Sequence, residues 1–118
     1  MIELENRIVR FAARCVKVCS ALPTTAVGSG SLADQLFRSS TGIAANYAEA
    51  CEAESAKDFV HKLKISMKEL SETRVWLKLI CEAEYIESQK LVDLINESQE
   101  LSRILSASIA TTKQKMRD

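Results

Sequence analysis

The sequence predicts an all-α protein, an antiparallel up-and-down four-helix bundle that forms one domain over residues 1–118. Apolar residues recur at spacings of three and four in four successive segments, which is the period of an amphipathic helix. The single proline and the three glycines fall mainly between or at the edges of these segments. Aromatic residues make up only 5% of the chain, and no run of alternating β-branched residues suggests a strand. A chain of 118 residues is long enough to bury one modest core.

The first helix is predicted over residues 3–21. Pro23 ends it, because the residue before a proline is pushed out of the helical region. Its apolar seam consists of Leu4, Ile8, Phe11, Cys15, Val18 and Leu22. A basic stripe runs beside this seam and comprises Arg7, Arg10, Arg14 and Lys17. Such a stripe is either a solvated helix face or a ridge that contacts phosphate or a partner.

Residues 22–30, LPTTAVGSG, form the first loop. Their GSGS run is not a phosphate-binding loop, because no strand precedes it and no Gly-Lys-Ser/Thr ending follows. Ser31 and Asp34 offer an N-cap for the second helix. The seam of that helix is Leu32, Leu36, Ser39, Ile43, Asn46 and Ala50. Gly42 lies within it and predicts a close backbone approach by a neighbouring helix.

The second helix is predicted to end near Ala53 and the third to begin near Ser55. Ser55 and Asp58 form a capping box in which the shorter Asp replaces the usual Glu. The seam of the third helix is Phe59, Leu63, Ser66, Leu70, Thr73 and Leu77. A second basic stripe lies opposite that seam and contains Lys57, His61, Lys64 and Lys68.

The end of the third helix is apolar almost all the way round. Val75 and Leu79 lie on its outer face and Trp76 on one flank. Because the outer face of a helix in an isolated bundle is normally polar, this surface predicts a subunit interface, with a buried crossing helix as the alternative.

Ser88 is predicted to cap the last helix. Its seam is Leu91, Leu94, Ser98, Leu101, Leu105 and Ser108, and it runs toward Thr112 before the tail KQKMRD frays. The four helices therefore have short connections, as an up-and-down bundle requires.

The charges balance overall, with 16 basic and 16 acidic side chains, so any attraction to nucleic acid must come from uneven placement. Residues 82–100 are predominantly acidic. In an antiparallel bundle the basic start of the third helix lies at the same end as the tail that holds Lys113, Lys115 and Arg117. Acidic residues fall near that end too, so we expect separate basic ridges.

No catalytic residue, cofactor or metal site is predicted. An acid–base centre could be drawn from Asn46, Glu49, Glu69 and Glu72, but no nucleophile, metal set or glycine-rich loop accompanies them. Polar clamps that involve Arg38, Asn46 and Glu49 and bridge helices or subunits explain these residues more economically.

The four cysteines lack paired C-x-x-C spacing and are expected to fill the core. The sequence also suggests a cytoplasmic protein. The first residues do not have the pattern of a signal peptide, and no apolar run approaches the ~20 residues that span a bilayer.

Residues 35–80 resemble the four-helix-bundle proteins encoded in intervening sequences of bacterial 23S ribosomal RNA genes. The resemblance rests on an ordered series: Gln35, Leu36, Arg38, Ser39, Asn46, Glu49, Ser55, Asp58, Phe59, Lys62, Leu63, Lys68, Glu69, Glu72, Thr73, Trp76 and Leu77. The outer helices match in length and amphipathic pattern. The chain is also similar to the accessory variability proteins of diversity-generating retroelements, which are more basic.

The resemblance implies a non-catalytic homo-pentamer around a central channel. Together with the basic stripes, it leads us to expect structured RNA as the partner. The residues expected to contact nucleic acid are Arg7, Arg10, Arg14, Lys17, Lys57, Lys64 and Lys68. Those expected at an oligomer interface or polar clamp are Arg38, Asn46, Glu49, Glu69, Glu72, Val75, Trp76 and Leu79. The alternative is a protein-interaction scaffold that uses the acidic residues 82–100 and the Trp76 flank without any nucleic acid.

Overall fold

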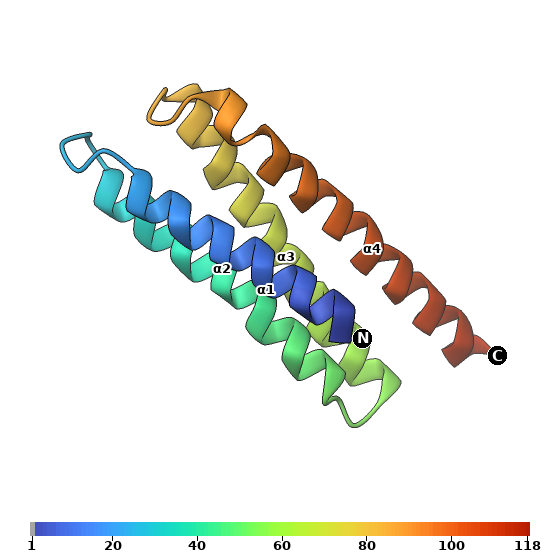
Figure 1. Cartoon of the computed structure of the whole chain (residues 1–118). Coiled ribbons are helices and arrows are strands. Elements are labelled where there is room, and N and C mark those ends of the chain that lie inside the picture. The colour runs from blue at the N-terminus through green and yellow to red at the C-terminus, as the bar shows by residue number, and fades with distance from the viewer. Residues whose placement is uncertain (1) are drawn as a thin grey trace.

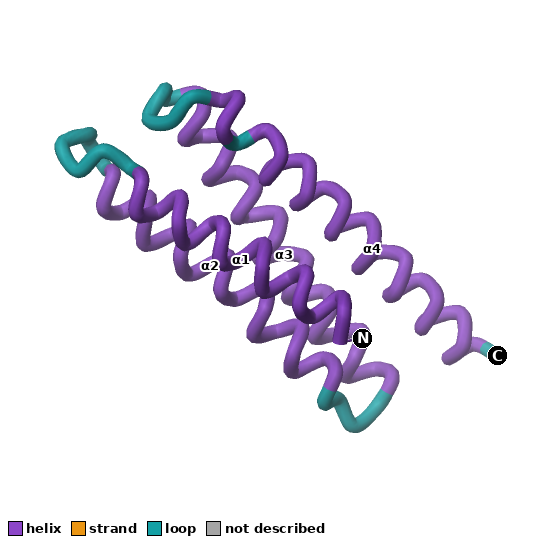
Figure 2. Tube along the Cα trace, viewed as in Figure 1, coloured by secondary structure: helices purple, strands orange, loops and turns teal. Residues whose placement is uncertain are grey.

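Four long helices run alternately up and down along one axis (Figure 1). The computed structural model describes residues 2–118, in which α1 is Ile2–Ala21, α2 is Ser29–Cys51, α3 is Ala56–Glu82 and α4 is Val92–Arg117. A short 3₁₀ helix, η1, covers Ser88–Lys90. The bundle measures 54 × 22 × 21 Å, and both chain termini lie at the end that holds the α2–α3 connection. Figure 2 shows only helices and loops over the described residues, which confirms the predicted all-α four-helix bundle.

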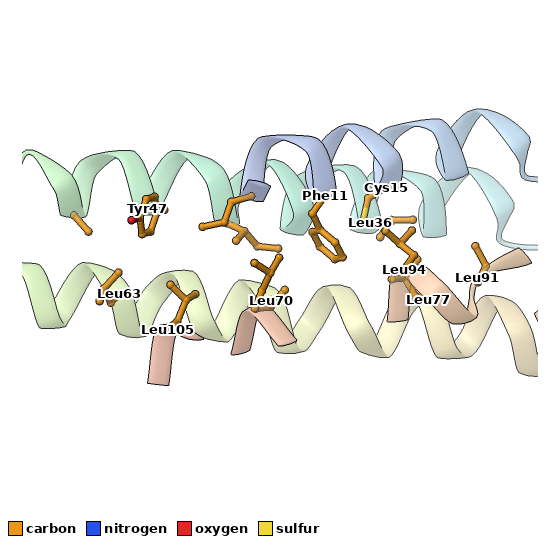
Figure 3. Packing of buried hydrophobic residues seen from close by; sticks show 14 of the residues in the cluster. Phe11, Cys15, Leu36, Tyr47, Leu63, Leu70, Leu77, Leu91, Leu94 and Leu105 are labelled. Atoms are coloured by element: carbon orange, nitrogen blue, oxygen red, sulfur yellow. The ribbon is translucent and has the colours of Figure 1, made fainter. Parts of the chain in front are cut away.

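The core follows the predicted seams with small shifts. Figure 3 shows Tyr47, Leu63 and Leu105 grouped toward one end, and Leu36, Leu77 and other apolar side chains toward the other. Tyr47 is buried where Asn46 was expected, and Ile109 is more buried than Ser108, because a straight helix drifts relative to a seven-residue repeat. The largest fully buried side chains also include Phe11, Ile8, Ile43, Leu70, Ile80 and Leu101.

Hydroxyl groups buried in the seams connect α2 to α3. Thr73 Oγ1 donates to Ser39 Oγ at 2.8 Å, and Ser66 Oγ donates to the carbonyl of Ile43 at 2.9 Å. These three side chains are fully buried. The α2–α3 pair is therefore joined by hydrogen bonds as well as by apolar packing, since a buried hydroxyl is costly unless it is paired.

The helices pack in chain order around the bundle. α2 has extensive contacts with α1 and α3, and α3 has extensive contacts with α4, whereas α1 and α4 touch over a smaller area. The α1–α4 seam is thus the least packed of the four neighbouring pairs.

Two of the four predicted helix starts are wrong, those of α2 and α4. α2 begins at Ser29 instead of near Ser31, because Gly28 adopts a left-handed φ of 74° and its carbonyl accepts from the Leu32 N–H at 2.9 Å. Ser88 opens η1 and does not cap α4, which starts after Leu91. The start of α3 is confirmed, since Ser55 Oγ accepts from the Asp58 N–H at 3.0 Å.

The predicted fraying after Thr112 is also wrong, because α4 stays helical to Arg117. At the opposite end of the bundle, the Tyr85 hydroxyl donates to the carbonyl of Val27 and so joins the α1–α2 and α3–α4 loops. No helix among the described residues is both long enough and apolar enough to cross a membrane.

Candidate nucleic-acid and subunit interfaces

The α1 stripe lies against an acidic side of α4. Arg7 Nε donates to Glu97 Oε2 at 2.7 Å, and Arg7 Nη2 donates to Glu97 Oε1 at 2.8 Å. This bidentate bond is the main cause of the lowered pKa of Glu97, and the charges of Arg14 and Arg10 lower it further. The stripe is therefore partly neutralised within the molecule, and Arg7 holds α1 to α4.

The α3 stripe has a different environment. Lys57, Lys64 and Lys68 are exposed, and in the part of the chain that the structure describes none of them forms an ion pair. Lys64 lies close to Lys113 of α4 and, as the largest cause, lowers the pKa of that lysine; Arg117 adds to the effect. The start of α3 and the basic tail thus lie at the same end, as the sequence predicted, and they form one surface.

Arg74 of α3 was not predicted as a site residue, yet it is bound across to α4. Arg74 Nε donates to Ser98 Oγ at 2.9 Å, and Arg74 Nη2 donates to the Ser98 carbonyl at 3.0 Å and to the Ser102 hydroxyl. Burial and then the nearby Arg103 lower the pKa of Arg74. No carboxylate among the described residues pairs with it. The sequence signal for this contact is the pair Ser98 and Ser102, which lie one turn apart on α4. Their hydroxyl groups are neutral hydrogen-bond acceptors.

A network of charges and hydrogen bonds closes the outer groove between α2 and α3. Arg38 donates to Glu72 and to Gln35, the latter at 3.1 Å, and lies 3.6 Å from Glu69. The indole N–H of Trp76 donates to Glu72 at 3.4 Å. Burial raises the pKa of Glu69, an effect that the charge of Arg38 opposes.

Gly42 makes room for this network. A Cβ at Gly42 would lie 2.5 Å from Glu69 Oε2, so the close approach predicted there is real, but it is made by a side chain and not by backbone. One helical turn away, Asn46 donates to the Gly42 carbonyl at 2.8 Å within its own helix, whereas Lys62 reaches Glu49 across the groove at 3.0 Å. Arg38 and Glu49 therefore clamp α2 to α3 and Asn46 does not.

The four side chains considered for catalysis thus lie along the groove between α2 and α3. The three carboxylates among them each lie beside a cationic side chain. Glu69 and Glu72 face Arg38, and Glu49 faces Lys62. The arrangement acts as a set of structural bridges, since each carboxylate already has a cationic partner.

The apolar surface predicted near the end of α3 is exposed. Val75 is 56% and Leu79 45% exposed, while Trp76 is partly buried. Leu79 and Trp76 line a groove of about 290 Å³ with Val27, Leu32, Gln35 and Tyr85. Trp76 and Leu79 therefore share a groove with the loop end of α2.

The cysteines are free thiols. Cys15 is buried in the core, and burial raises its pKa to about 12. Cys19, Cys51 and Cys81 are only partly buried, so the expectation of core-filling cysteines holds fully for Cys15 alone.

The fold and these surfaces define a helical-bundle protein of the up-and-down class whose notable features are charged and apolar outer faces. The chain matches the family of 23S rRNA-intervening sequence proteins over residues 2–107, and it belongs to that family. It is similar to a crystal structure of a protein of unknown function from the S23 ribosomal protein family of Bacteroides thetaiotaomicron. The two share 32% identity with a TM-score of 0.79 over 90% of this chain and 97% of the other. No curated protein matches the chain.

Proposed function

We propose that this protein is a non-catalytic, cytoplasmic homo-oligomer that binds structured RNA through phosphate contacts. The observation that carries the proposal is the row of exposed lysines on α3, Lys57, Lys64 and Lys68, which form no ion pair within residues 2–118. Unpaired surface cations are the groups that displace counterions from a nucleic-acid backbone. The family name refers to 23S rRNA intervening sequences, which makes a hairpin of such an insert the first RNA to test.

Assembly would multiply these contacts. Exposed Val75 and Leu79 beside partly buried Trp76 support a contact between copies, and the family resemblance suggests five copies in a ring. In a ring, several weak phosphate sites act on one RNA and their affinities combine.

The RNA test is binding of the assembled protein to a folded hairpin from a ribosomal insert, compared with an unrelated hairpin across a salt series. Binding that falls steeply with salt and prefers the insert supports the proposal. Absence of binding to either hairpin at low salt refutes it.

The assembly test is the molar mass of the double variant Val75→Glu, Leu79→Glu in solution. We expect dissociation, because two charges would be buried in an apolar contact. Met116→Glu is the matched control, since Met116 is similarly exposed, at 49%, but lies near the opposite end of the bundle. An unchanged mass for the double variant would place the interface elsewhere.

A protein-interaction scaffold is the second candidate, favoured by the apolar groove beside Trp76 and by the acidic segment 82–100. Under that function, partner binding survives replacement of the α3 lysines by glutamine and is lost when Leu79 is replaced by glutamate.

A further inference from the structure

The outer face formed by α3 and α4 collects basic side chains from both helices. We call it the α3–α4 basic face, and it comprises Lys57, Lys64, Lys68, Arg74, Lys113 and Arg117. Among the described residues, none of the six pairs with a carboxylate. From Lys57 to Arg74 the face extends about 25 Å along α3, at a rise of ~1.5 Å per residue.

The end of the face farthest from the basic tail is a fixed cation. The Arg74 guanidinium is held on α4 by Ser98 Oγ at 2.9 Å and by the Ser98 carbonyl at 3.0 Å. These acceptors are neutral, so they orient the group without cancelling its charge. A guanidinium held in this way loses little additional entropy when it meets an anion.

The basic end of the face holds like charges together. Lys64 of α3 lies beside Lys113 of α4 and lowers the pKa of that lysine, and Arg117 adds to the effect. Like charges at short range are unfavourable, and a bound polyanion would relieve that repulsion.

The charge of the α1 stripe is partly compensated within the molecule, because Arg7, one of its four cations, is paired. Arg7 is bound by both oxygens of Glu97. The charges of Arg14 and Arg10 also lower the pKa of that carboxyl group. The acidic side of α4 thus compensates α1, while the opposite side of α4 joins the basic face.

We propose that the α3–α4 basic face binds the sugar-phosphate backbone of a nucleic-acid duplex, and that Arg7 of the α1 stripe serves to hold α4 in place. This inference rests on the proposed function and assigns its binding surface. Single-strand recognition relies on aromatic side chains that stack on bases, and this face has none. Phe11 and Tyr47 are in the core, and Phe59 packs against it. Phe37 and Trp76 lie on other faces, and Tyr85 lies at the loop end of the bundle. Contacts made only to phosphates carry no sequence preference.

The test compares two triple variants that remove the same charge. The face variant is Lys64→Gln, Lys68→Gln, Lys113→Gln, and the stripe variant is Arg10→Gln, Arg14→Gln, Lys17→Gln. Each is titrated with an RNA duplex, a DNA duplex of the same length and a single-stranded RNA, at about 50 to 200 mM salt. Circular dichroism verifies that both variants keep the helical content of the parent.

We expect the face variant to lose at least about tenfold in duplex affinity at low salt and to lower the salt slope by about 2 to 3, since each phosphate contact contributes ~0.9. The stripe variant should change affinity by less than about threefold, through long-range charge alone. A larger loss in the stripe variant than in the face variant would overturn the inference and leave the proposed function standing. Preference of the parent protein for the single strand would also overturn the inference. Failure of the parent to bind any of the three probes would refute the proposed function itself.

Discussion

The Arg7–Glu97 bond gives the sharpest test of how the bundle closes. α1 and α4 have the smallest contact of the neighbouring helix pairs. A bidentate ion pair between them therefore contributes a large share of the interaction energy that joins these two helices. We propose a double-mutant cycle of Arg7→Gln, Glu97→Gln and the double variant. The cycle isolates the pairwise energy from the separate effects of each substitution.

The expected coupling follows from the geometry. Hydrogen bonds to charged groups stabilise proteins by ~1.5–3 kcal/mol when they are well formed. The Arg7 side chain is 34% and the Glu97 side chain 22% exposed, so solvent screening reduces the energy toward that of surface pairs. We therefore expect a coupling energy of about 1 kcal/mol near neutral pH.

The sign of the pH dependence is fixed by the lowered pKa of Glu97 in the folded protein. A carboxyl group whose pKa falls on folding contributes stability above its unfolded pKa, near ~4.3, and that stability is lost as the pH falls through the folded value. Urea unfolding followed by circular dichroism, at fixed protein concentration, measures both quantities. A coupling energy below about 0.3 kcal/mol at neutral pH, or one unchanged by acid, would refute the closing role of this pair.

Four further outcomes are expected. Leu70→Ala, at a fully buried site, should lower the free energy of unfolding by about 2–5 kcal/mol in urea titrations. Ser55→Ala should cost about 1 kcal/mol because it removes the cap of α3, whereas Ser88→Ala should cost far less, and equal costs would contradict the assigned helix starts. Glu84→Gly should stabilise the protein by about 0.5–1 kcal/mol, since Glu84 has a φ of 61° that favours glycine; a lower melting temperature would disprove this. Cys15, whose pKa is about 12, should resist thiol alkylation at mildly alkaline pH until the protein is unfolded, as mass spectrometry would show.

Helix existence and core seams were predictable because one periodic signal determines both. Leu63, Leu70 and Leu77 recur at the helical repeat, and burying that stripe requires neighbours with the same pattern. Helix boundaries were less predictable where several residues could serve. Ser31 and Ser88 are good capping types, but the left-handed Gly28 and the 3₁₀ turn η1 fixed the true starts.

The surfaces were predictable in composition but not in pairing. The sequence shows four basic residues in a stripe on α1, yet it does not show that Glu97, ninety residues away, meets Arg7. It likewise shows Arg74 without showing that only serines of α4 accept its hydrogen bonds. Which cation is left without an acidic partner depends on the rotation of each helix about its own axis. The amphipathic pattern predicts that rotation too coarsely to say which side chains of neighbouring helices meet.

An even number of alternating helices returns the chain to the end of the bundle where it entered, so α1 starts and α4 stops on the same side (Figure 1). A short linker between these ends would allow the chain to be reopened in the 22–28 loop, giving a circular permutant with the same helix neighbours in a new covalent order. Any peptide fused before α1 or after α4 would project from the side of Lys113 and Arg117. The loops at Val27 and Tyr85 would stay unobstructed.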